Sequence, residues 1–194
     1  MEVPLKKGTY GYLRQKRTMS LIKSILLLAA VFLIYFLALR HYHTNKNVFS
    51  ILAAVMALPA ARSVVVTVMC FRAVGASHAV RDLVARVPGL KEETSGFDLY
   101  LTGYDRSFSL SHAAIGGGLL AGFTEDPRTD CALCRDHIRR MLDENGRGGL
   151  RIEIFRDPDL YRKALEEIAG APAADGEAAA GDRAAMDLVR SISL

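Results

Sequence analysis

The sequence predicts a small α+β domain attached to a two-helix transmembrane hairpin. Three observations lead to this prediction: two long apolar runs follow each other, the charge of the chain changes sign after them, and the residues beyond them alternate between helix-like and strand-like apolar spacing. The expected segments are a basic cytoplasmic arm at 1–23, the hairpin at 24–72, the cytosolic domain at 73–170 and a flexible Ala-rich tail at 171–194.

The hairpin is predicted from two apolar runs. Residues 24–39 carry no charge and approach the roughly 20 apolar residues that a helix needs to cross a bilayer. Residues 48–71 are long enough but contain Pro59 and Arg62. Only helices and closed barrels satisfy their own backbone in lipid, so the two runs predict an antiparallel helix pair joined by the polar residues 40–47.

A cleaved signal peptide is the alternative interpretation of the first run, because a basic start and an apolar core are common to both. The run ends in Leu37, Ala38 and Leu39, which is a poor small-residue cleavage site, and another apolar run follows directly. We therefore favour the hairpin.

The distribution of charge predicts how the hairpin is oriented. Residues 1–72 hold ten of the 25 Lys and Arg residues and one of the 21 acidic residues, a net charge of +9, whereas residues 73–194 have a net charge of −5. Basic residues concentrate before the first run and after the second, which predicts a two-span protein of the cell membrane with both termini in the cytoplasm. The basic excess thus belongs to the membrane flank, with attraction to anionic lipid, and no nucleic-acid partner is predicted.

Arg62 is the unusual residue of the second run. It lies ten residues before Arg72, or about 15 Å along a helix. A charge inside a membrane is a functional candidate, which here would pair with an acidic residue of another span. In the other interpretation residues 48–61 form the spanning segment, Pro59 allows a kink, and Arg62 lies at the interface. The sequence leaves both interpretations open.

Apolar spacing in the remainder predicts a sheet of three or four strands with helices on one side. Helices are expected at 76–87, at 125–145 and at 157–170. Strands are expected at 97–104, 107–110, 119–124 and 150–155. The run Gly116-Gly117-Gly118 is interpreted as the turn of a hairpin. Beyond Gly170 the Ala, Gly, Asp and Glu content predicts a flexible tail with at most a loose helix at 184–192.

Cys131, Cys134 and His137 form a C-x2-C-x2-H pattern. Zinc needs about four ligands, and no second pair of Cys or His follows. We interpret the cysteines as buried or incidental thiols, with metal binding and redox chemistry as alternatives. Structural disulfides are not expected in a reducing cytoplasm.

The run from Asp98 through His112 and the three glycines to Thr124 resembles the central hairpin of nuclease-related domains of the restriction-endonuclease-like fold. Those domains place an Asp before the hairpin turn and Glu-x-Lys after it, where this chain has His112 and Gly122-Phe123-Thr124. The resemblance covers roughly residues 76–156 and implies a degenerate, inactive fold. The layout of the whole chain also resembles uncharacterised two-span membrane proteins of Gram-positive bacteria, and that likeness implies no activity.

The sequence favours a membrane-anchored protein whose cytosolic domain mediates protein interaction or assembly, with another membrane or cytosolic protein or with a second copy of itself. No complete catalytic constellation is visible, and no cofactor is expected. The alternative function is a membrane-tethered, metal-dependent hydrolase or nuclease derivative that uses Asp98, His112 and Glu125.

Overall fold

The computed structural model describes residues 5–42, 48–103, 106–172 and 176–194. Its contacts divide the chain into two units. One unit is the hairpin, Arg14–Arg72, and the other combines Met1–Leu13 with Ala73–Leu194. The turn predicted at 40–47 lies mostly outside the described residues, which exclude 43–47.

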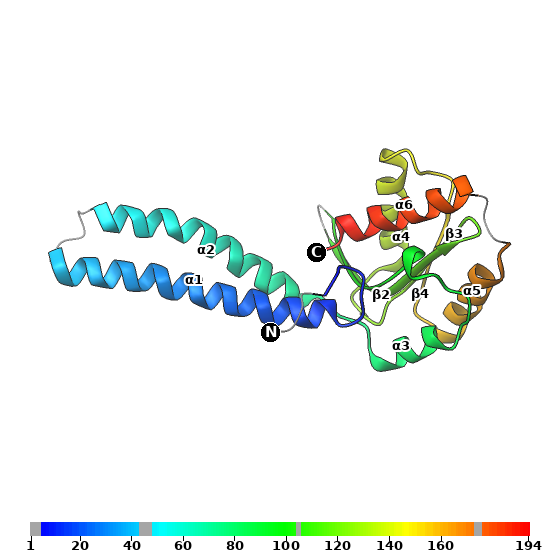
Figure 1. The fold of residues 1–194 in the computed structure, drawn as a ribbon, viewed down its shortest axis with the longest axis horizontal. Coiled ribbons are helices and arrows are strands. Elements are labelled where there is room, and N and C mark those ends of the chain that lie inside the picture. Colours follow the sequence, from blue (N-terminus) through cyan, green and yellow to red (C-terminus); the bar gives the residue numbers. More distant parts are fainter. Residues whose placement is uncertain (1–4, 43–47, 104–105, 173–175) are drawn as a thin grey trace. The chain divides into compact units, whose positions relative to one another are not determined.

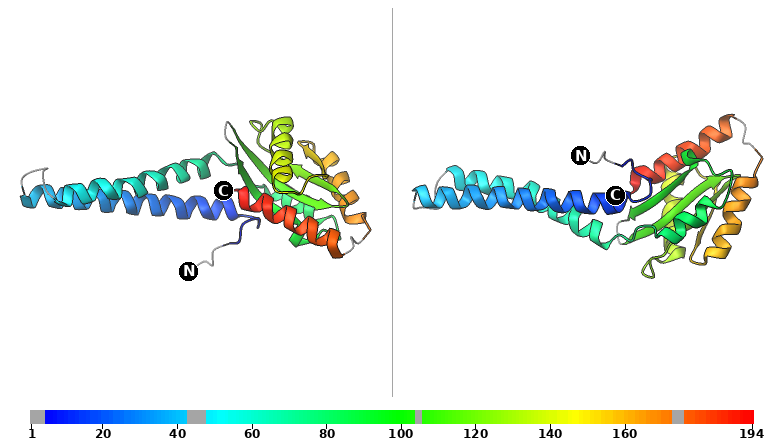
Figure 2. Two further views of the ribbon diagram at one scale, coloured as in Figure 1. Left: turned by 90° about the horizontal axis from the view of Figure 1, so that it is seen from above. Right: turned by 60° about the horizontal axis from the view of Figure 1, so that its bottom comes forward.

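The hairpin unit contains most of two long helices, α1 (Tyr12–Tyr42) and α2 (Val48–Arg72), which lie side by side in all views (Figure 1, Figure 2). The stretches Tyr12–His41 and Ile51–Arg72 are long and apolar enough to span a membrane. Most of their large apolar side chains are exposed, unlike those of a core helix in a soluble protein. The prediction of two long apolar helices is therefore confirmed.

The other unit is an α+β domain built on a four-stranded mixed sheet, which confirms the predicted fold class and the prediction of three or four strands. The strands lie in the order β1-β2-β3-β4. The pairs β1–β2 and β2–β3 are antiparallel and β3–β4 is parallel. The strands are β1 (Ser95–Thr102), β2 (Ser107–Gly116), β3 (Leu119–Phe123) and β4 (Arg151–Phe155). Gly117 and Gly118 both have positive φ and form the predicted turn between β2 and β3.

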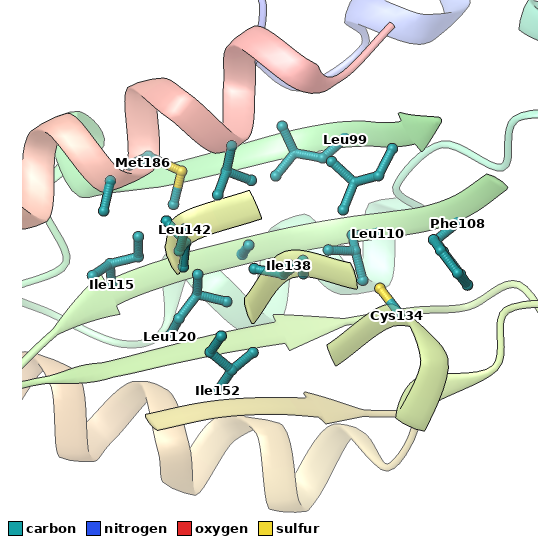
Figure 3. Close-up of a cluster of buried hydrophobic side chains, with 14 residues drawn as sticks. Leu99, Phe108, Leu110, Ile115, Leu120, Cys134, Ile138, Leu142, Ile152 and Met186 are labelled. Carbon is teal, nitrogen blue, oxygen red and sulfur yellow. The ribbon is translucent and has the colours of Figure 1, made fainter. Parts of the chain in front are cut away.

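Helices cover both faces of the sheet, so the prediction of helices on one side is wrong (Figure 1). One face packs against α4 (Cys131–Glu144) and α6 (Gly176–Ile192). Figure 3 shows this core, with Ile138 and Leu142 of α4 and Met186 of α6 among the strand side chains.

The opposite face packs against α3 (His78–Ala85) and α5 (Pro158–Gly170). Apolar side chains of β3 point to both faces: Leu120 contributes to the first core, and Leu119 and Ala121 to the second. A strand buried on both faces reads as a continuous apolar run, so the run at 119–123 was the sequence signal for a second covered face.

Helix α6 corrects the prediction of a flexible tail at 171–194. Its residues Ala185, Met186 and Val189 are buried in the same core as Leu99. Only one face of the helix is buried, so its average composition resembles that of a disordered segment even though the buried residues recur at helical spacing.

Side-chain caps fix where the domain helices begin. Helix α5 starts beside Asp157, as predicted, because this carboxylate accepts hydrogen bonds from the first backbone N–H groups of the helix. Helix α4 begins at Cys131 and not at 125–128, because the Asp130 carboxylate accepts hydrogen bonds from the Ala132 and Leu133 N–H groups. Ser77 caps α3.

The first described residues of the chain pack on the domain. The Gly8 carbonyl accepts a hydrogen bond from the Phe97 N–H at 2.8 Å. The Tyr10 ring meets Phe97 edge to face, and its hydroxyl lies 3.1 Å from His78 Nδ1. Part of the predicted arm at 1–23 is therefore integral to the domain, and residues 12–23 belong to α1, which begins at Tyr12.

Candidate functional site

Asp98 stands at a break in the ladder between β1 and β2. Its neighbours Phe97 and Leu99 both pair with β2, whereas Asp98 and the opposite Ser111 do not pair. The φ angle of Asp98 is 56°, a left-handed conformation that Asp tolerates better than most residues. Side-chain alternation reverses at this point, since Leu99 lies in the core under α4 and α6 and Phe97 packs in the opposite one.

The carboxylate of Asp98 binds the backbone on both sides of the hairpin. Oδ2 accepts a hydrogen bond from the Leu13 N–H at 3.3 Å, and Oδ1 accepts one from the Ala76 N–H at 2.7 Å. Leu13 is the last residue before the hairpin unit, and Ala73 is the first after it. Asp98 is 3% exposed, and this burial raises its pKa although the N–H groups of Ala76, Leu13 and Gly11 act to lower it.

Ser109 and Glu125 hold the segment after the hairpin at two further points. Ser109 Oγ accepts a hydrogen bond from the Val74 N–H at 3.2 Å. Glu125 Oε2 accepts one from the Ser77 N–H at 2.9 Å. We call Asp98, Ser109 and Glu125 the connector site, because their side chains hold the segments that connect the domain to the hairpin.

Asp126 orients the Ser109 hydroxyl. Its Oδ2 accepts a hydrogen bond from Ser109 Oγ at 3.2 Å, which leaves the serine oxygen to accept from the backbone. Arg128 donates to both oxygens of Asp126, and this guanidinium holds the pKa of the carboxyl below its ordinary value. The Arg128 N–H also donates to Asp126, which gives an Asx turn.

His112 is buried in the core and faces α5. Its Nδ1 lies 2.6 Å from the Tyr161 hydroxyl, and its ring centre lies 4.3 Å from that of Phe97. Its Nε2 has no hydrogen-bond partner in the described part of the chain. Burial lowers the pKa of His112 to about 3, so the imidazole is neutral at pH 7.

The neutral His112 predicts a loss of stability in acid. An unfolded histidine titrates near 6.5. The unfolded chain therefore binds more protons than the folded chain between pH 6.5 and about 3. We expect His112 to lower the free energy of unfolding by about 2 kcal/mol between pH 7 and pH 5. The double variant His112→Phe with Tyr161→Phe should lose about 2 kcal/mol less over this range, because it removes the titrating group and its partner together.

This pH dependence can be measured by denaturant unfolding of the full chain in detergent micelles, followed by circular dichroism. The single variant Tyr161→Phe provides the control, because it keeps the buried histidine and should therefore keep the pH dependence of the unsubstituted protein. An equal loss of stability in the double variant would show that other groups cause the acid sensitivity.

The predicted ligand sets do not come together as metal sites. The described residues include no group of three or more His, Cys, Asp or Glu side chains placed to hold a metal ion. Asp98 and Glu125 bind backbone N–H groups, while His112 binds Tyr161.

The Cys-x2-Cys-x2-His residues share one helix but not one site. Cys134 is buried in the core, and this burial raises the pKa of its thiol to about 12. Cys131 is half-buried and has no disulfide partner. The His137 ring packs against Phe108 with centres 5.6 Å apart. In this arrangement Cys134 is a core residue and its thiol stays protonated at neutral pH.

Arg62 is exposed on α2 and makes no hydrogen bond or ion pair with any residue that the structure describes.

Sequence reasoning did not identify Ser109 and Asp126 as members of a site. For Asp126 the local signal was Asp126-Pro127-Arg128, which is typical of an Asx turn.

The fold and the connector site together define an α+β domain held to the segments that lead into and out of two candidate membrane-spanning helices. Comparisons with protein-family models, curated proteins and solved structures find no match. The resemblance to nuclease-related domains therefore stays a prediction.

Proposed function

We propose that this protein is a membrane-anchored interaction protein. Its hairpin spans the cell membrane with both termini in the cytoplasm, and its domain binds another membrane or cytosolic protein, or a second copy of itself, without catalysis. The proposal extends the two apolar helices to a membrane location and the basic flanks to a cytoplasmic orientation.

The proposal rests on one observation, which is that the polar side chains of the connector site bind the backbone of the same chain. Asp98 and Ser109, which are 3% and 2% exposed, accept hydrogen bonds from the chain's own connecting backbone. A catalytic carboxylate would have to reach a substrate, whereas these oxygens already have donors. The arrangement suits a domain whose task is to stay attached next to the membrane and present its outer surface.

Site-specific photocrosslinking in intact cells tests this function. Leu133 on α4 and Leu160 on α5 are large apolar residues that are 43% and 51% exposed, so a crosslinking amino acid at either position samples the outer surface. We expect an adduct of defined mass at one of them, and none at the exposed polar Ser191. An adduct of twice the chain mass would identify a second copy as the partner.

A different combination of results would contradict the interaction proposal. If neither position gives an adduct, and the purified full chain hydrolyses a substrate at a rate that Glu125→Gln abolishes, the domain is an enzyme and the interaction proposal is wrong. The variant Glu153→Gln serves as the matched control, since Glu153 pairs with Arg151 outside the connector site.

A further inference from the structure

Buried hydroxyl groups set the register of the two hairpin helices. Ser24 Oγ of α1 lies 2.9 Å from Ser63 Oγ and 2.8 Å from Thr67 Oγ1 of α2. All three residues are buried. Small hydroxyl residues let two helices approach closely and hydrogen-bond across the contact, so this triad fixes which parts of α1 and α2 lie side by side.

A second contact gives the same register nearer the ends of the unit. Arg17 Nε donates to the Cys70 carbonyl at 3.2 Å, and its guanidinium carbon lies 5.3 Å from the centre of the Phe71 ring. Residues 14–23 of α1 therefore lie alongside residues 63–72 of α2.

This register brings Lys23 and Arg62 to nearly the same level of the hairpin, because each precedes a serine of the bonded pair. The uncharged stretches beyond them contain 16 residues in 24–39 and 14 residues in 48–61. At 1.5 Å per residue they extend about 24 Å and about 21 Å. Long basic side chains at their ends can reach the surfaces of a hydrocarbon core about 30 Å thick.

If the hydrocarbon core of the bilayer ended at Arg72, its edge would fit the apolar sequence of α2 but not the sequence of α1. Cys70 and Phe71 contact Arg17, so a bilayer that covered α2 up to Arg72 would also bury Lys16, Arg17 and Lys23 in hydrocarbon. Each charge in the bilayer is costly, and a boundary at Lys23 and Arg62 avoids all of them.

We propose that Lys23 and Arg62 lie in the lipid headgroup layer and bind headgroup phosphates. Residues 14–23 and 63–72 then form a two-helix stalk outside the hydrocarbon core. Ammonium and guanidinium groups both bind phosphate, which is the anionic group that this layer offers. The inference rests on the membrane insertion that the proposed function assumes.

Depth-dependent fluorescence quenching tests the position of the stalk. The chain contains no Trp, so a single introduced Trp reports one position. Phe32 on α1 and Val68 on α2 are matched sites, with side chains 57% and 53% exposed. The full-length Phe32→Trp and Val68→Trp variants are reconstituted in vesicles of phosphatidylcholine and phosphatidylglycerol with bromine atoms near the centre of the acyl chains.

We expect bromine to quench the Phe32→Trp variant at least about threefold more than the Val68→Trp variant, and aqueous acrylamide to show the reverse order, because Val68 lies beyond the headgroups. Equal, strong bromine quenching at both sites would overturn the stalk and place Arg62 deep in the bilayer. Weak bromine quenching at both sites would contradict the membrane insertion in the proposed function.

The role of Arg62 is tested by placing the reporter at Val65. In a Val65→Trp background, Arg62→Leu should let α2 sink and raise bromine quenching about twofold, whereas Arg62→Lys should leave quenching unchanged. No effect of Arg62→Leu would show that Arg62 does not set the boundary. Excess inorganic phosphate should have no effect, and a rise in quenching on its addition would assign Arg62 to a free anion and not to the lipid.

Discussion

The Asp98→Ala variant is expected to lower the free energy of unfolding by about 2–5 kcal/mol. The substitution removes the acceptors of the Leu13 and Ala76 N–H groups, and an unsatisfied buried donor costs about 1–3 kcal/mol. Alanine at a φ of 56° adds backbone strain. Denaturant unfolding of the full chain in detergent micelles measures the loss.

Two further substitutions separate the hydrogen bonds from the strain. Asparagine tolerates positive φ and keeps one oxygen, so Asp98→Asn should lose about half as much stability as Asp98→Ala. Glycine removes the strain but not the missing acceptors, so Asp98→Gly should remain strongly destabilised. A near-neutral Asp98→Gly together with a damaging Asp98→Ala would mean that the carboxylate contributes little and that strain alone explains the effect.

A local readout distinguishes loss of the connector site from general destabilisation. Without Asp98 the segment 73–77 loses one of the three attachments that the connector site provides, so proteases should cleave it more readily under native conditions. Met186→Ala, which weakens the core elsewhere, provides the matched control. Cleavage at 73–77 should rise more in Asp98→Ala than in this control.

Hydropathy and alternation were sufficient to predict the two apolar helices, a sheet of three or four strands and the glycine turn after β2, because the helices, the individual strands and the turn each depend on residues close in sequence. The connector site depends on distant ones. Asp98 bonds to the backbone of Leu13 and Ala76, which are 85 and 22 residues away. Strict alternation predicted Phe97 and Leu99 on one face of the sheet and Asp98 on the other face. No sequence pattern showed that the alternation would reverse at Asp98.

His112 illustrates the same limit for buried polar groups. Its partner Tyr161 is 49 residues away and comes from the helix that covers the second face of the sheet. Since the sequence predicted helices on one side only, it offered no partner for His112 from a second layer of helices. A polar residue in a strand reveals its role only when the layer that covers it is known.

Met186→Ala is expected to cost about 2–4 kcal/mol of unfolding free energy. The side chain is fully buried in the core shown in Figure 3, where α6 covers β1 and β2. Removing a buried Met side chain loses its transfer free energy and leaves a cavity that the core closes only partly. The same denaturant titration in micelles provides the measurement, which also tests whether the C-terminal residues belong to the domain.

The neighbouring Asp187 is the matched control for this test, because it lies on the exposed face of the same helix, where its carboxylate pairs with the Arg190 guanidinium at 3.1 Å. Asp187→Ala should change the unfolding free energy by less than about 1 kcal/mol. Deleting residues 176–194 should be far more damaging than either substitution, since it uncovers Leu99 and Leu101 at once. A flexible tail would give the opposite pattern, with both substitutions within about 0.5 kcal/mol of the unsubstituted protein and the deletion tolerated.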